Sequence, residues 1–130
     1  MVKEAKHIYL ADLHFEHKVW LNEFDFFKDE IQIFSERMAQ LESRNNSADF
    51  SAAFESLQNR LIRQKEVLDE LRHEVKSHEH NLASFAEEHP IAVDHVFFTD
   101  HSELRSKANR FKELYTEFKD EFNRFSAKWM

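Results

Sequence analysis

The chain has no glycine, no cysteine and a single proline among its 130 residues. An average chain of this length would hold roughly nine glycines and six or seven prolines. Because glycine reaches positive φ angles at little cost, its absence excludes P-loops, glycine-rich dinucleotide fingerprints and the G-x-S-x-G turn of serine hydrolases. Without cysteine there is no disulfide, thiolate catalysis, iron–sulfur cluster or cysteine-based zinc site. Histidine, carboxylate, tyrosine and hydroxyl side chains remain available for chemistry.

Long apolar runs and an excess of basic residues are also missing. The longest strictly apolar runs hold two to four residues, whereas a transmembrane helix needs roughly 20. Residues 1–12 contain no apolar stretch of the kind found in signal peptides, so we expect a cytoplasmic protein without a membrane span. The net charge of −7 disfavours general nucleic-acid binding, which requires a cationic face.

Apolar residues recur at alternating spacings of three and four in three long segments, a pattern typical of helices packed as in a coiled coil. These seams run from Leu10 to Leu41, from Phe54 to His89 and from His101 to Trp129. Each keeps its register over four to five heptads without a skip. The spacing therefore predicts an all-α fold.

The residues between the seams carry signals for the ends of helices. The break at 43–47 is polar, and its asparagines tolerate the left-handed conformation that often ends a helix. Ser47 is a suitable N-cap for the second helix, and Pro90 should end that helix near Glu88. Asp100, followed three residues later by a glutamate, resembles a capping box and predicts the start of the third helix.

These boundaries predict helices at about 9–43, 48–88 and 100–129, with lengths of roughly 50, 60 and 45 Å. A short first connection makes the first two helices antiparallel, and the second connection returns the third alongside them. We therefore expect residues 1–130 to form a single domain, an elongated antiparallel up-down-up three-helix bundle with coiled-coil-like heptad packing. The apolar connection at 91–99 should fold back over the end of the bundle.

A second apolar line lies beside the seam of the first helix. It consists of Phe15, Val19, Phe26 and Ile33, at spacings of four and seven. Three helices bury one broad stripe each, so this line either widens the core contact or faces another chain. We expect a homo-oligomer, with a dimer favoured on general grounds. Alternatively, the connection after Pro90 or the N-terminal residues cover the line.

The nine histidines are unevenly distributed. They are His7, His14, His17, His73, His78, His80, His89, His95 and His101. None lies between Lys18 and Arg72 or after Ser102. In the predicted bundle they gather at one end. This segregation is informative because imidazole is the commonest transition-metal ligand and also titrates near neutral pH.

Two groups of these residues are candidate sites. The turn at Asn45–Asn46 makes His14 level with His78, so the first group is His14, His17, Glu74 and His78. Such nitrogen and oxygen donors suit zinc or another divalent transition metal. Buried imidazoles hydrogen-bonded to a carboxylate or a carbonyl, or histidines on a wet surface, explain the same pattern without a metal.

The second group lies nearer the tip of the predicted bundle, about 15 Å from the first. It consists of His7, His89 and His101, with Glu4, Glu88 and Glu103 nearby. At this separation the two groups are expected to be different sites. The repeated Asp-His pairs at 94–95 and 100–101 offer carboxylates that can orient imidazoles.

No catalytic constellation is visible. The Glu-x-x-His pairs at 4–7 and 70–73 are out of register for a di-iron bundle site. The sequence therefore favours a non-enzymatic structural or protein-interaction module that self-associates through its first helix. The alternative is a metal-binding protein whose site lies at the histidine-rich end.

Overall fold

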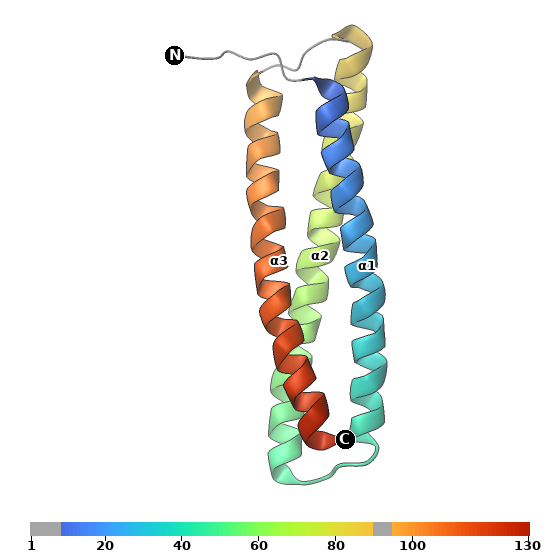
Figure 1. Ribbon diagram of the computed structural model, residues 1–130, viewed down its shortest axis with the longest axis vertical. Coiled ribbons are helices and arrows are strands. Elements are labelled where there is room, and N and C mark those ends of the chain that lie inside the picture. Colours follow the sequence, from blue (N-terminus) through green and yellow to red (C-terminus); the bar gives the residue numbers. More distant parts are fainter. Residues whose placement is uncertain (1–8, 90–94) are drawn as a thin grey trace.

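A computed structural model describes residues 9–89 and 95–130, which form three long helices. They are α1 (Leu10–Glu42), α2 (Ala48–Glu88) and α3 (His95–Trp129). Each helix packs against both others. As Figure 1 shows, α1 and α3 run in the same direction and α2 runs back beside them. The described part of the chain contains no strand. The predicted all-α, up-down-up three-helix bundle is confirmed.

The first hairpin is capped by side chains. Ser47 is the N-cap of α2, as predicted, and its hydroxyl accepts the Phe50 N–H at 3.1 Å. The expected left-handed asparagine is wrong, since no described residue has a positive φ. Instead, the Asn45 amide donates to the carbonyls of Leu41, at 2.8 Å, and Trp129, at 3.0 Å. It therefore ends α1 and also fastens the hairpin to the end of α3.

The predicted start of α3 at Asp100 is wrong, because the helix begins five residues earlier, at His95. No glycine or proline interrupts residues 95–99, so the helical hydrogen bonds continue upstream of the capping-box pattern. Asp100 is an exposed residue inside the helix. Of the predicted connection at 91–99, residues 91–94 lie outside the described residues and residues 95–99 belong to α3. The extra residues lengthen α3 by about 7.5 Å and move His101 almost two turns into the helix.

The seam residues build a core in two parts. The main cluster extends from Trp20, Val75 and Leu104 to the hairpin end of the bundle. A small cluster of Leu10, Leu13 and Leu82 lies at the other end. Between them the core is polar. His17 and His101 are the only polar side chains that are buried among the described residues.

A ladder of ion pairs fixes the register between α1 and α3. Each pair joins residues 89 positions apart, and successive pairs are one heptad apart. The pairs are Glu16–Arg105, Glu23–Lys112 and Glu30–Lys119. Partly exposed pairs of this kind contribute at most about 1 kcal/mol each. Their main effect is therefore to define which residues of α1 and α3 share a level.

None of the helices in the described ranges is apolar enough over a sufficient length to cross a membrane.

The core makes a direct prediction about stability. Phe24 is fully buried and packs edge-to-face on Phe111, with ring centroids 6.2 Å apart. Replacing a core phenylalanine by alanine costs about 3–5 kcal/mol, because the burial is lost and a cavity remains. We expect Phe24→Ala to lower the free energy of unfolding by this amount in urea denaturation. Ile62→Ala is the control, since Ile62 is a large apolar residue of α2 that is 51% exposed. Similar losses in both variants would contradict the packing described above.

Candidate metal centre

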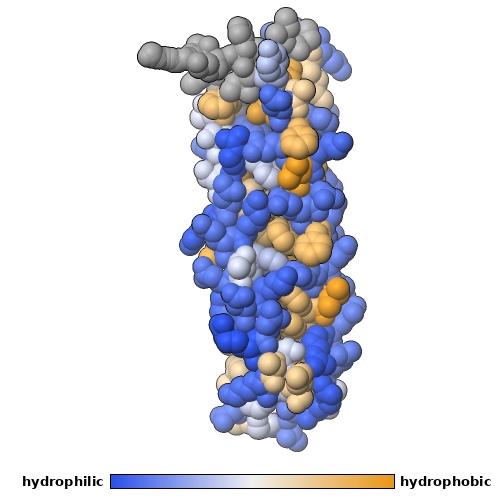
Figure 2. Space-filling model, in the orientation of Figure 1, coloured by the Kyte–Doolittle hydropathy of each residue, from blue (hydrophilic) through white to orange (hydrophobic). Residues whose placement is uncertain are grey.

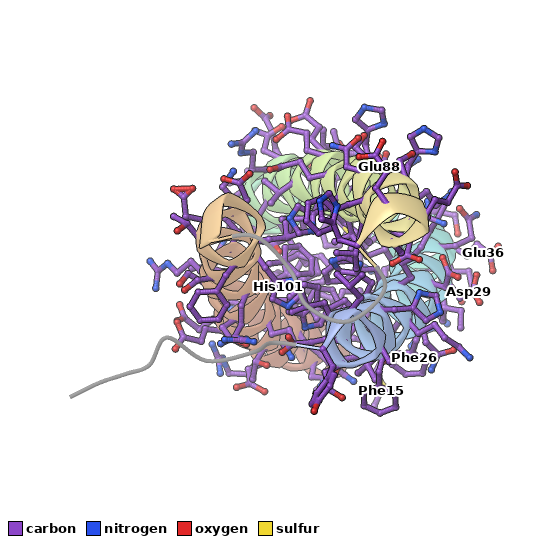
Figure 3. The ribbon with its side chains drawn as sticks, turned by 90° about the horizontal axis from the view of Figure 1, so that it is seen from above. Phe15, Phe26, Asp29, Glu36, Glu88 and His101 are labelled. Carbon is purple, nitrogen blue, oxygen red and sulfur yellow. The ribbon has the colours of Figure 1, made fainter. Side chains whose placement is uncertain are left out.

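Three histidines, one from each helix, meet in the polar layer of the core. They are His17 of α1, His78 of α2 and His101 of α3. One nitrogen from each lies within 4.8 Å of the other two. His17 and His101 are 1% and 0% exposed, and His78 is half-buried. Seen down the bundle axis, His101 points inward among the three helices (Figure 3).

The seam register explains the convergence, because all three residues occupy seam positions on their helices. The rings contact one another, with centroids 4.9 Å apart for His17 and His78 and 5.0 Å apart for His17 and His101. Trp20, one seam position beyond His17, stacks on the His101 ring at 5.1 Å. The histidine layer therefore packs directly on the main cluster, to which Trp20 belongs.

His17 is held between a carboxylate and a second imidazole. Its Nδ1 lies 2.7 Å from Glu79 Oε1, and its Nε2 lies 2.9 Å from His78 Nδ1. A carboxylate only accepts, so Nδ1 carries the proton and the lone pair of the neutral ring is on Nε2. That lone pair accepts the hydrogen bond from His78. The other oxygen of Glu79 contacts His14 Nδ1 at 2.5 Å.

His101 is held in the same way by Glu16. Its Nε2 lies 2.5 Å from Glu16 Oε1, and Arg105 donates two further hydrogen bonds to that carboxylate, at 2.8 and 2.9 Å. Because Nε2 donates, the lone pair of neutral His101 is on Nδ1. The Nδ1 atom is buried and has no hydrogen-bond partner among the described residues. A buried lone pair without a partner is costly unless something binds to it.

The electrostatics of the layer keep its imidazoles neutral. Burial lowers the pKa of His17 and of His101, although the hydrogen bonds to Glu79 and Glu16 act in the opposite direction. Burial, and then the repulsion that a protonated His17 would exert, lower the pKa of His78. The hydrogen bond from Arg105 lowers the pKa of Glu16 to about 2. The neutral ring is the form that binds a metal, and the carboxylate that orients it stays ionised.

The three histidines that meet in the structure come from both of the candidate groups predicted from the sequence. His17 and His78 come together as expected, but Glu74 forms an ion pair with Lys107 at 2.8 Å. His14 is exposed and is bound to Glu79. His101, expected in the tip group, joins His17 and His78, because the early start of α3 moves it inward.

The rest of the tip group is not assembled in the described residues. His89 is exposed at the end of α2, where it stacks on Phe85 with ring centroids 4.2 Å apart. His7 lies outside the described residues. No site containing both His89 and His101 is therefore seen in this part of the chain.

The two carboxylates that anchor the rings, Glu79 and Glu16, were not among the predicted site residues. Glu79 was detectable, because the hairpin register that makes His14 level with His78 brings Glu79 equally near. Glu16 was not, because its position opposite His101 depends on the register of α3 against α1. That register is visible only once the ion-pair ladder is known.

The layer has the donor set of a transition-metal site. Three neutral imidazoles suit zinc and other divalent transition metals, and zinc accepts three protein ligands plus one further ligand. Zn–N bonds of about 2.0–2.1 Å in a tetrahedron would place the nitrogens about 3.4 Å apart. In the metal-free chain the three nitrogens lie within 4.8 Å of one another. Glu79 and Glu16 lie where carboxylates commonly accept the other ring N–H of metal-bound histidines. The three residues can hold a metal ion.

Comparison with known proteins gives no further guidance: no protein-family model, curated protein or solved structure matches the chain.

The lowered histidine pKa values predict that acid destabilises the metal-free protein. A buried neutral imidazole takes up its proton mainly in the unfolded chain, so the free energy of unfolding falls as pH drops below the unfolded pKa of about 6.5. In the presence of a chelator, we expect the melting temperature to fall between about pH 8 and about pH 5.5. The fall should be smaller in a His17→Leu, His78→Leu double variant, because leucine suits both seam positions.

The control for this measurement is a His73→Leu, His80→Leu double variant of α2, since both residues are exposed. Its melting temperature should respond to acid as the wild type does. An equal acid response in the wild type and the seam variant would show that protonation of this layer does not affect folding.

Proposed function

We propose that this chain is a metal-binding helical bundle that holds one divalent transition-metal ion, zinc for preference, through His17, His78 and His101. The observation that carries the proposal is the orientation of the lone pairs. His17 Nε2 and His101 Nδ1 both bear lone pairs within the layer, while the opposite nitrogen of each ring is fixed on a carboxylate. The hydrogen bond from His78 to His17 supports the proposal, in which the ion takes the place of the shared proton.

The surroundings supply the charge that such an ion needs. Glu79 and Glu16 stand directly behind two of the three ligands, and each raises the basicity of its imidazole through the shared hydrogen bond. Arg105 holds Glu16 in place and keeps that carboxylate ionised. The ligands come from all three helices, so a bound ion joins the small apolar cluster at the end of the bundle to the main core. It stabilises the folded chain by mass action.

The test is metal analysis and titration of protein purified without a polyhistidine tag. We expect one zinc or cobalt ion per chain, released by acid and by chelators. His101→Leu should weaken zinc binding by at least about 100-fold, since loss of even an orienting carboxylate costs about 10–100-fold. Glu79→Gln should fall within that smaller range. His80→Leu, which removes an exposed histidine from α2, is the matched control and should leave the affinity unchanged.

Two results would contradict the proposal. One is a wild-type protein that takes up no stoichiometric metal. The other is a His101→Leu variant that folds, as judged by its circular dichroism, and binds zinc as tightly as the wild type does.

A second function, self-association, is favoured by the surface of α1. The apolar line of Phe15, Val19, Phe26 and Ile33 is 39–67% exposed. Apolar surface follows the side of the bundle along which α1 runs (Figure 2), and Phe15 and Phe26 point away from the helices (Figure 3). Exposed apolar lines of this length are unusual on monomers. This surface supports the proposal that two copies of the chain associate through α1.

The prediction for self-association is that Phe26→Asp shifts the chain toward monomer without loss of helix. A charge in the middle of the line would have to lose its water in any contact between copies. Ile62→Asp is the matched control, because Ile62 is 51% exposed but lies on α2. Sedimentation of the wild type, Phe26→Asp and Ile62→Asp at tens of micromolar measures the effect. A monomeric wild type would exclude this association.

A further inference from the structure

A groove runs between each pair of helices, and in two of the three grooves a carboxylate binds a ring of the histidine layer. Between α1 and α2, the Glu79 carboxylate bridges His14 and His17. Between α1 and α3, Glu16 is bound at once by His101 and by the Arg105 guanidinium. An ion that passed through either groove would have to break the contacts that orient its own ligands.

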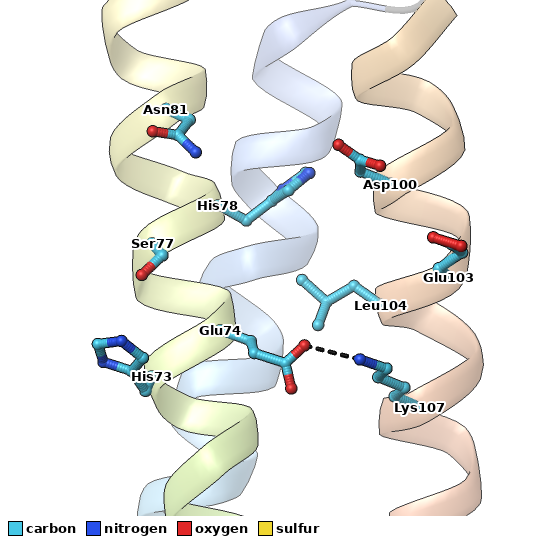
Figure 4. Close-up of a pocket in the computed structure, with 9 residues that line it drawn as sticks. All are labelled: His73, Glu74, Ser77, His78, Asn81, Asp100, Glu103, Leu104 and Lys107. Atoms are coloured by element: carbon cyan, nitrogen blue, oxygen red, sulfur yellow. Dashed lines mark hydrogen bonds and ion pairs between the residues drawn. The ribbon is translucent and has the colours of Figure 1, made fainter.

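The third groove lies between α2 and α3. It contains a pocket of about 290 Å³ with His78 in its wall. Figure 4 shows His78 reaching across from α2 below Asp100 of α3, while the ion pair of Glu74 and Lys107 spans the groove one turn farther along. Of the three ligands, His78 is the least buried. The pocket therefore reaches His78 from the surface, and neither Glu79 nor Glu16 is part of its lining.

The charges along this pocket favour a cation. The pocket lining holds three carboxylates, Glu74, Asp100 and Glu103, and one cation, Lys107, so its net charge is negative. Figure 4 shows the Asp100 carboxylate facing the end of the His78 ring, where it can stabilise the positive charge of an approaching cation. A groove lined by charge of one sign raises the local concentration of the opposite ion and its association rate.

We infer that the pocket between α2 and α3 is the route by which the metal ion reaches the three histidines, and that the ion's fourth coordination position opens into it. This inference rests on the proposed metal-binding function. The ligand expected at the fourth position is water or another small oxygen or nitrogen donor, because three imidazoles leave one position of a tetrahedral ion unfilled. The carboxylates that attract the cation also disfavour anionic ligands there.

The experiment compares cobalt binding in the wild type and in an Asp100→Asn, Glu103→Gln double variant. Visible absorption of the bound ion reports its association rate in stopped flow, and azide is the probe for the fourth position. The variant should bind Co²⁺ about 3–10-fold more slowly at low ionic strength, with the difference shrinking as salt is added. Its affinity for azide should rise by about 2–3-fold, because the anion is no longer repelled.

The matched control is Asp29→Asn, Glu36→Gln, which removes the same charge from the exposed face of α1, toward the hairpin end. A steric variant tests the route separately. Ser77→Phe adds bulk to the pocket wall and should slow both association and release of cobalt, with little change in affinity. Ser35→Phe, in a groove between α1 and α2, is its control.

The outcomes separate this inference from the proposed function. If the wild type binds no metal, the proposed function fails and this inference fails with it. If the wild type binds one ion but the Asp100 and Glu103 variant matches its charge control in both cobalt rate and azide affinity, the site stands and the route is wrong. Unchanged kinetics in Ser77→Phe would exclude the pocket as the path.

Discussion

The meeting of three imidazoles in one layer of the core, two of them fully buried, is the constraint on which the histidine end of the bundle depends. An imidazole in an apolar seam leaves polar nitrogens away from water, and each needs a partner. Glu79 and Glu16 supply partners at the outer nitrogens of His17 and His101, and Arg105 then holds Glu16 in place. The Glu16–Arg105 contact is also the first of the three ion pairs, spaced one heptad apart, that join α1 and α3. The position of the histidine layer is therefore tied to the heptad register of these two helices.

The sequence predicted the fold well because its signals are local. Alternating spacings of three and four define which side of each helix is buried, and Ser47 marks the start of α2. The beginning of α3 could not be predicted in the same way. A capping-box pattern indicates where a helix can start, but the helix continues upstream when no glycine or proline stops it. That error of five residues separated His101 from His17 and His78 in the prediction, although all three were recognised as seam residues.

The choice between Glu74 and Glu79 shows a different limit. Both lie near His78 on α2, but they project on opposite sides of the seam, Glu74 toward α3 and Glu79 toward α1. An up-down-up bundle can place its third helix on either side of the first two, and each choice exchanges the grooves that these glutamates face. Heptad spacing is the same in both arrangements. The seams alone therefore could not show that Glu79, and not Glu74, binds the histidine layer.

The polar layer is larger than a structural role requires. One buried polar residue is enough to fix register in a helical bundle, at some cost in stability. Gln64 is a residue of this kind. Its buried side-chain oxygen has no hydrogen-bond partner within the described residues, which is the cost in stability. The histidine layer instead replaces apolar residues on all three helices and divides the core into two clusters. It also fixes the outer nitrogens of two rings on carboxylates, so that their lone pairs lie inside the layer. Register needs neither the convergence nor the orientation, whereas coordination of a metal ion needs both.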